Sequence, residues 1–265
     1  MTYSALLMVF PFVFGVGCVG AKPAAGEVRE PAHTTLPTNM PSSPQARDVE
    51  PVVEPKNVES GVPDPVQPPA VAQPCPEDMV DVASVCIDRF EAPNEKGKHP
   101  LLMQSAHDAE AWCKERGKRL CNEDEWVRAC EGPQHLPFPY GETYQQGVCN
   151  DDKTWKAVQW GRLGRWPDDV ARAEANRLDQ SEPSGMREGC RSAEGVYDLT
   201  GNAGEWVIRT RDNPTNYSHV VKGCYWGKCF RPPHTPSCEY VNYGHEAGFR
   251  SYEFGFRCCK DRGAS

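Results

Sequence analysis

Gly195-Val-Tyr-Asp-Leu-Thr-Gly-Asn-Ala-Gly-Glu-Trp206 is the stretch from which the fold of this chain can be inferred. A short apolar run leads into a bend of small residues, and a carboxylate and an indole follow. Glycine adopts backbone angles that side chains forbid, so such a bend can turn several carbonyl oxygens inward. With Asn202 and Glu205 they form the all-oxygen set that calcium prefers. The spacing matches no EF-hand, and a packed turn in which Glu205 caps backbone amides fits the residues as well.

The stretch resembles the signature of the formylglycine-generating enzyme (sulfatase-modifying factor) family, Gly-x-Tyr-Asp-hydrophobic-x-Gly-Asn-x-x-Glu-Trp. Further segments resemble that family in the same order along the chain: Cys86-Ile-Asp-Arg-Phe-Glu91, Gly117-Lys-Arg-Leu120, Glu123-Asp-Glu-Trp126, Phe138-Pro-Tyr-Gly141, Val221-Lys-Gly223 and Gly255-Phe-Arg-Cys258. The resemblance covers about residues 75–260. It implies an α+β, irregular C-type-lectin-like variant fold with little regular secondary structure, but a fold does not fix an activity.

The amino-acid composition indicates the type of compartment and argues against one class of partner. The chain has 265 residues, a formal net charge of −8 and 13 cysteines. The acidic balance, without any basic run, argues against nucleic acid as a general partner. So many cysteines, without zinc-ribbon spacing, indicate an oxidising compartment and a disulfide-rich domain.

The N-terminus predicts export and a lipid anchor. Residues 5–19 are nearly all apolar but too few to span a bilayer, which takes roughly 20 residues, so they are typical of a secretory signal. Gly15-Val-Gly-Cys18 resembles a bacterial lipobox, although Gly15 departs from it and no Lys or Arg precedes the apolar run. We expect a lipoprotein-type signal peptide at 1–17 and lipidation of Cys18, giving an outer-membrane lipoprotein that faces the periplasm or the cell surface. A plain signal peptide is the alternative.

Residues 19–74 and 75–262 differ sharply in composition. The first segment holds 12 of the 25 prolines and few large apolar side chains, so it predicts a disordered tether. The second is the predicted domain. Without Cys18 the 13 cysteines become 12, an even number, all within the domain, which favours a disulfide framework. Besides Cys224 and Cys229, the disulfide candidates are Cys75, Cys86, Cys113, Cys121, Cys130, Cys149, Cys190, Cys238, Cys258 and Cys259.

Local patterns predict four elements. β-prone runs on either side of Ala83-Ser84 favour a hairpin, whose open end a Cys75–Cys86 bond could close. A Ser-x-x-Asp capping box at Ser105 starts one helix, and Asn122 starts another. A short helix is expected at 169–178, within residues 155–182, which match the family poorly.

The family resemblance also implies structural calcium bound in two loops. The ligands carried over are Asn150 and Asp151 in the first loop and, in the second, Thr200, Gly201 and Ala203 through main-chain oxygens with the side chains of Asn202 and Glu205. Further first-loop ligands would fall in residues 155–182, where the match is poor.

Catalysis in the family uses two copper-binding cysteines separated by four residues. Cys224 and Cys229 have that gap, and a thiolate pair suits copper(I). They begin about four positions too early, however, and Pro232-Pro233 stands where the second cysteine should be. The histidines show no His-x3-His pairing that would indicate another metal centre.

The preferred functional hypothesis is a non-catalytic binding or interaction module of the cell envelope, with an envelope protein, a peptide or a glycan as partner and a membrane contact through the N-terminal lipid. The first alternative is a copper-dependent oxidase that converts a protein cysteine to formylglycine, so copper is expected only if the domain is catalytic. The second is a structural envelope protein.

Overall fold

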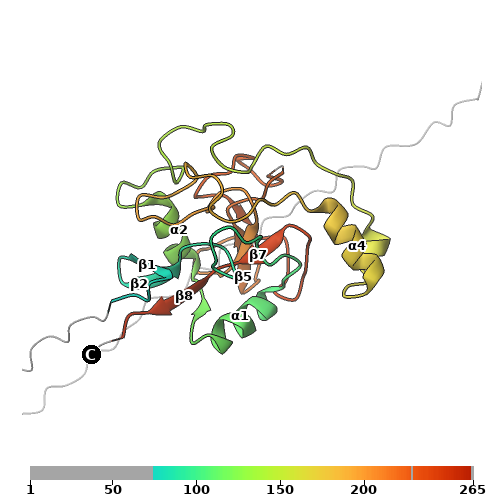
Figure 1. Ribbon diagram of the computed structural model, residues 1–265, viewed down its shortest axis with the longest axis horizontal. Coiled ribbons are helices and arrows are strands. Elements are labelled where there is room, and N and C mark those ends of the chain that lie inside the picture. Colours follow the sequence, from blue (N-terminus) through green and yellow to red (C-terminus); the bar gives the residue numbers. More distant parts are fainter. Residues whose placement is uncertain (1–73, 228, 264–265) are drawn as a thin grey trace, which may run out of the picture. The chain divides into compact units, whose positions relative to one another are not determined.

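The computed structural model describes residues 74–227 and 229–263 (Figure 1). The predicted signal peptide, the lipidation site Cys18 and residues 19–73 of the predicted tether lie outside these residues. Within the described part of the chain, no helix is both long enough and apolar enough to cross a membrane.

The first sheet contains both ends of the domain. The predicted hairpin is confirmed: β1 (Met79–Val82) pairs antiparallel with β2 (Val85–Asp88), and Ala83 in the two-residue turn has a φ of 57°. Strand β8 (Cys258–Asp261) pairs antiparallel with β2 on one side and with β3 (Arg119–Leu120) on the other. The last strand therefore lies between segments from the start of the domain.

The second sheet carries the glycine-rich bend of the Gly195–Trp206 stretch at one end of a strand. Its order is β6 (Val241–Asn242), β5 (His219–Lys222), β4 (Gly204–Ile208) and β7 (Phe254–Phe256). Strand β4 is antiparallel to β5 and parallel to β7. The bend at 200–204 thus leads directly into an inner strand, and both flanking strands reach it from later in the chain.

Two helices pack against these sheets. Helix α1 (Ala106–Glu115) begins as predicted: the Ser105 side chain accepts the Asp108 N–H at 3.2 Å, and the Asp108 carboxylate accepts the Ser105 N–H at 2.8 Å. Helix α2 (Glu123–Glu131) begins after Asn122, also as predicted. Helix α1 contacts β3, β4 and β7, whereas α2 contacts β1, β4 and β5. The largest fully buried apolar side chains are Trp126, Trp206, Trp226, Phe256, Ile87, Leu120, Leu178 and Leu199.

Helices α3 (Trp160–Leu163) and α4 (Asp169–Leu178) lie in residues 155–182, which we call the α3–α4 segment. The predicted bounds of α4 are confirmed, and Asp168 caps the helix by accepting the Ala171 N–H at 2.9 Å. Glu174, whose side chain is buried, accepts the Gln159 N–H at 2.9 Å and so ties α4 to the start of α3. The segment is ordered by its own caps and ion pairs.

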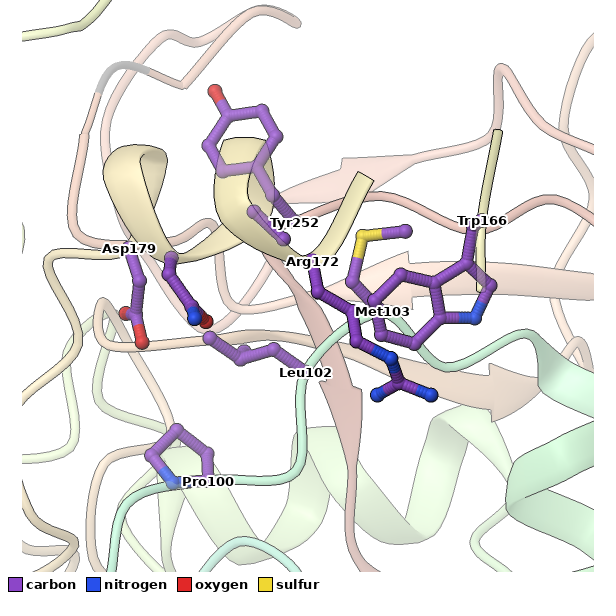
Figure 2. A pocket seen from close by; sticks show the side chains of 9 residues that line it. Pro100, Leu102, Met103, Trp166, Arg172, Asp179 and Tyr252 are labelled. Carbon is purple, nitrogen blue, oxygen red and sulfur yellow. The ribbon is translucent and has the colours of Figure 1, made fainter. Parts of the chain in front are cut away.

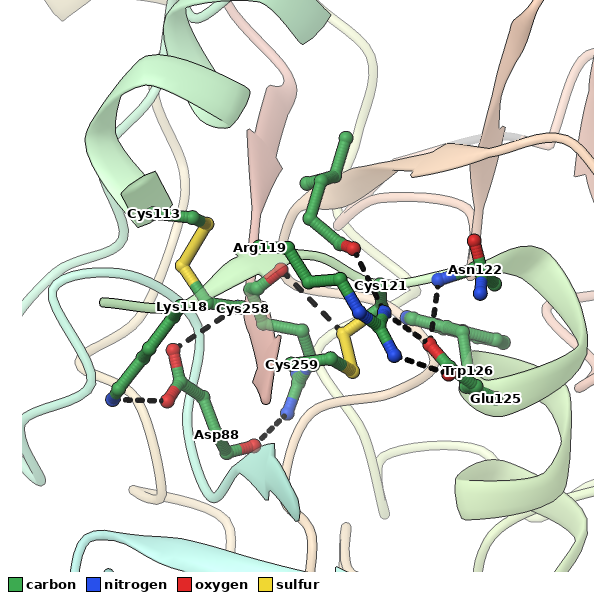
Figure 3. The surroundings of a disulfide bond; sticks show 12 residues. Asp88, Cys113, Lys118, Arg119, Cys121, Asn122, Glu125, Trp126, Cys258 and Cys259 are labelled. Carbon is green, nitrogen blue, oxygen red and sulfur yellow. Dashed lines mark hydrogen bonds and ion pairs between the residues drawn. A yellow bond between two sulfur atoms is a disulfide. The ribbon is translucent and has the colours of Figure 1, made fainter. Parts of the chain in front are cut away.

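Six disulfides connect all twelve cysteines of the domain, which confirms the predicted framework. The pairs are Cys75–Cys86, Cys113–Cys258, Cys121–Cys259, Cys130–Cys238, Cys149–Cys190 and Cys224–Cys229. The adjacent Cys258 and Cys259 bridge to α1 and to the residue after β3 (Figure 3). These two bonds span 145 and 138 residues, and loop-closure entropy assigns about 5 kcal/mol to each. The expected α+β, loop-rich and disulfide-rich architecture is therefore observed.

Candidate functional site

Glu205, the carboxylate of the Gly195–Trp206 stretch, is fully buried in an ion pair. Its Oε2 accepts Arg257 Nε at 2.6 Å and Trp126 Nε1 at 2.8 Å, and its Oε1 accepts Arg257 Nη2 at 2.5 Å. Arg257 also donates to the carbonyl of Tyr197 at 2.9 Å. Both oxygens of Glu205 are thus engaged by side chains within the domain.

Two more buried carboxylates surround this pair. Burial raises the pKa of Asp198 to about 6, although Arg257 and the Gly185 N–H oppose the shift. Burial, together with the charges of Asp198 and Glu205, also raises the pKa of Glu91 well above its usual range. Glu91 accepts from Asn202 Nδ2 at 2.7 Å, so this acidic cluster directly supports the bend.

The bend in turn positions the segment that carries Cys224. The Gly201 N–H donates to the Gly223 carbonyl at 2.9 Å, and the Trp226 N–H donates to the Asn202 carbonyl at 3.0 Å. Gly223 has a φ of +84°, and a Cβ there would lie 2.5 Å from the Leu199 carbonyl oxygen. Only glycine fits this close approach. The signature stretch therefore holds the segment that carries Cys224, the cysteine segment, in place, and we call this contact the cradle.

Cys224 and Cys229 are brought together as a disulfide in which each residue is 3% exposed. Cys224 lines a narrow recess together with Phe230, Asn242 and Glu253. These last three residues also line a cavity of about 330 Å³, which we call the aromatic cavity. Its lining residues are Trp160, Phe230, Arg231, Asn242, His245, Phe249, Ser251 and Glu253.

The aromatic cavity combines exposed rings with a buried acid. Trp160 of α3 is 59% exposed and Phe230 is 50% exposed, whereas Glu253 is only 7% exposed. Burial raises the pKa of Glu253 to about 7, against a hydrogen bond from Tyr252 that favours its charged form. The His245 ring stacks on another ring of the wall, with 4.1 Å between centroids. Aromatic faces beside a carboxylate are suited to a cationic group.

The two predicted calcium loops meet, since the Asn202 N–H donates to the Asn150 carbonyl at 2.7 Å. In the first loop, Asn150 Oδ1 and Asp151 Oδ2 are buried and have no hydrogen-bond partner among residues 74–227 and 229–263. In the second, Asn202 Oδ1 accepts Asn150 Nδ2 at 3.0 Å and the Glu182 N–H at 2.8 Å. Buried oxygens without donors suit a hard cation, so the first loop fits calcium better than the side chains of Asn202 and Glu205 do.

The other predicted ligands of the second loop, Thr200, Gly201 and Ala203, are buried between the cysteine segment and the first loop. Burial raises the pKa of Asp151 to about 6, and Tyr144 donates to its other carboxylate oxygen at 3.2 Å. A bound cation would favour the charged form of that carboxylate.

A second cavity, of about 270 Å³, lies between α4 and residues 100–103 (Figure 2). Leu102, Met103 and Trp166 supply its apolar wall, and the Arg172 guanidinium lies 5.0 Å from the Trp166 ring centroid. Sequence reasoning missed both cavities, because the α3–α4 segment contributes to each and that segment carries no family motif.

Comparison with known proteins identifies the domain type. Residues 41–262 match the model of the sulfatase-modifying factor enzyme 1-like domain. The formylglycine-generating enzyme of Bos taurus is 29% identical over 192 residues, which cover 62% of this chain and 44% of the relative. The inactive C-alpha-formylglycine-generating enzyme 2 of Bos taurus is 29% identical over 133 residues, covering 50% and 40% respectively.

The chain thus spans less than half the length of either relative. Among solved structures, that of CarF aligns with a TM-score of 0.47 and 14% identity, over 68% of this chain and 87% of CarF. The family match covers most of the chain, including every framework motif from Cys86 to Cys258. The chain belongs to the family of sulfatase-modifying factor enzyme 1-like domains.

Proposed function

We propose that this chain is a non-catalytic binding module, and that its aromatic cavity takes a cationic side chain of a peptide or protein partner in the cell envelope. The observation that supports the proposal most is the state and place of Cys224 and Cys229. They are bonded to each other and buried, outside the register in which the family resemblance places copper-binding cysteines.

The copper-dependent oxidase is the rival function. Copper(I) chemistry requires two thiolates that are free to bind the metal. In this chain the two sulfurs are bonded to each other, so copper(I) could bind them only after the bond is reduced, and the family resemblance places Pro232 and Pro233 where the second cysteine should be. The four-residue gap between Cys224 and Cys229 is the feature that favours the oxidase. It equally suits a short disulfide loop that shapes the cavity wall.

The chemistry of the aromatic cavity supports a cationic ligand. The Trp160 and Phe230 rings are exposed and can contact a cation through their faces, an interaction of about 0.5–2 kcal/mol. Glu253 supplies a largely buried carboxylate, and burial strengthens the attraction of a carboxylate for a cation. Among the described residues of the wall the one guanidinium or ammonium group is that of Arg231, which lies over the Tyr243 ring with 4.9 Å to the centroid.

Calcium, in this proposal, stabilises the loops beneath the site rather than acting in it. Asn150 and Asp151 would contribute the side-chain oxygens that the domain leaves without donors. A calcium ion at this point would fix the first loop against the bend that cradles Cys224.

Lipidation of Cys18 remains part of the proposal, and a Cys18→Ala variant should release the protein from membranes.

The binding proposal is tested with acetyl-Gly-Arg-Gly-amide, titrated into the purified protein at pH 8, where Glu253 is ionised. The neutral analogue with citrulline in place of arginine is the control ligand. We expect Glu253→Gln to weaken arginine-peptide binding by about 10-fold or more, because a charge-assisted hydrogen bond is lost. The exposed Glu246, replaced by Gln, is the matched control and should bind as the wild type does.

Two results would contradict the proposal. One is equal binding of the arginine and citrulline peptides. The other is undiminished binding by both Glu253→Gln and Trp160→Ala, which would place the ligand outside the aromatic cavity.

A further inference from the structure

Three groups with metal-binding chemistry meet on the surface that α1 and β5 share. His107 and Glu110 lie three residues apart on α1, with 3.6 Å between Nδ1 and Oε2. His219, the first residue of β5, approaches the same carboxylate, with 3.1 Å between its Nε2 and Oε1. The two imidazole centroids are 6.3 Å apart. Glu110 therefore contacts a histidine on each side.

His219 is held in one orientation by its neighbours. It is only 6% exposed, and its Nδ1 lies 2.9 Å from Ser218 Oγ. When Nδ1 donates its proton to Ser218, Nε2 presents a lone pair to Glu110, so two acceptors face each other at 3.1 Å. In the other tautomer Ser218 Oγ–H donates to Nδ1 and Nε2–H donates to Glu110, so the contact accommodates either a proton or a metal ion between the two atoms. Metal-binding histidines are commonly oriented in this way through their other ring nitrogen.

We propose that His107, Glu110 and His219 bind a divalent transition-metal ion of the zinc type. Two imidazoles and one carboxylate form a familiar zinc ligand set, which leaves a fourth position for water or a small ligand. In the side-chain conformations of residues 74–227 and 229–263, no three His, Cys, Asp or Glu side chains are already arranged to hold a metal ion. The side chain of His107 is 67% exposed and that of Glu110 is 42% exposed, and exposed side chains change rotamer readily to complete such a set.

The fourth position would face a cavity of about 470 Å³ that His107 and Glu110 line. Its described lining residues include three cations, Lys114, Lys118 and Arg119, of which the last two are paired with carboxylates. Lys118 pairs with Asp88 at 2.6 Å, and Arg119 pairs with Glu125 at 2.6 Å. The site is distinct from the aromatic cavity, with which it shares no lining residue. A search of the sequence for His-x3-His spacing does not find this proposed site, because its ligands come from two elements.

Zinc titration of the purified protein tests this site. The protein is first alkylated without reduction, so that any free thiol is blocked, and calcium is kept in the buffer. We expect one zinc ion to bind, and His107→Ala and Glu110→Gln each to weaken binding at least about 10-fold, since loss of even an outer-sphere partner costs that much. Cobalt(II) should give the absorption of a low-coordinate site in the wild type but not in His107→Ala.

The matched control is His135→Ala. His135 is exposed and lies 3.2 Å from Glu131 on α2. The Glu131 carboxylate also contacts Glu239 but, among the residues that the structure describes, contacts no second imidazole, so loss of His135 should leave zinc affinity unchanged. The proposal is overturned if the wild-type protein binds no zinc. It is also overturned if His107→Ala and Glu110→Gln bind zinc as tightly as the wild type. In either case a proton, not a metal ion, joins His219 to Glu110.

Discussion

Replacing Glu205 by glutamine tests how much the carboxylate of the signature stretch contributes to the stability of the domain. Glu205 accepts three hydrogen bonds, two of them at Oε2 and one at Oε1. Glutamine offers one acceptor oxygen. If that oxygen takes the Oε2 position, the contacts to Trp126 and Arg257 Nε remain, but an NH2 group faces Arg257 Nη2. The fully buried Arg257 loses its closest negative charge.

The expected loss of stability can be set from the surroundings of Arg257. Removing one partner of a buried ion pair costs about 3–5 kcal/mol. We place Glu205→Gln near 3 kcal/mol, at the lower end, because the ionised form of Asp198 also attracts Arg257. For a domain of this size, about 3 kcal/mol corresponds to a decrease of roughly 6–12 °C in Tm.

Glu125→Gln is the matched control. Glu125 binds Arg119 through both oxygens, but the pair is partly exposed, so the change should cost about 0–1 kcal/mol. Thermal unfolding is followed by circular dichroism with disulfides intact, with calcium and with chelator. A Tm for Glu205→Gln as high as that of the control would refute the argument. A loss seen only in calcium would instead make Glu205 a calcium ligand.

Three further variants test the calcium loop, the buried acid and the cradle. A chelator should lower the Tm of the wild type but not that of Asp151→Asn, because the unpartnered Asp151 oxygen is the proposed ligand; an equal decrease in both would argue against that role. The raised pKa of Glu253 means that its protonated form favours folding, so stability should fall as pH rises from about 5 to 8, by at most roughly 3 kcal/mol. In urea titrations across this range Glu253→Gln should show a smaller fall, and a profile identical to that of the wild type would be inconsistent with the buried acid. Gly223→Ala should lower stability by about 1–3 kcal/mol more than Gly97→Ala. Both glycines have positive φ, but of the two only Gly223 would place an added Cβ 2.5 Å from a carbonyl oxygen. Equal losses of stability would mean that the cradle is not tightly packed.

Local signals in the sequence predicted the elements that depend on near neighbours. The caps at Ser105 and Asn122 set the starts of α1 and α2, and the short helix expected at 169–178 is observed as α4. The hairpin at Ala83-Ser84 and its Cys75–Cys86 bond are equally local. In each case the residues that define the element lie within about a dozen positions of one another.

The disulfides and ion pairs that join distant parts of the chain could not be predicted from the sequence. Nothing in the spacing of Cys113 or Cys121 predicts that their partners are the adjacent Cys258 and Cys259, because that choice depends on β8 lying between β2 and β3. The role of Glu205 was likewise hidden, since its partner Arg257 is 52 residues away. A carboxylate beside a glycine-rich bend matches a calcium ligand and a buried ion pair equally well until its partner is known.

The central claim, that the domain binds rather than oxidises, depends most directly on Cys224 and Cys229. The purified protein should be alkylated without reduction, digested and analysed by mass spectrometry, and a Cys-x-Pro-x-Arg peptide should be incubated with it in the presence of copper(I). We predict a linked Cys224–Cys229 peptide and an unchanged substrate cysteine. Two free thiols at these positions, protected from alkylation by copper(I) and accompanied by formylglycine in the peptide, would contradict the account.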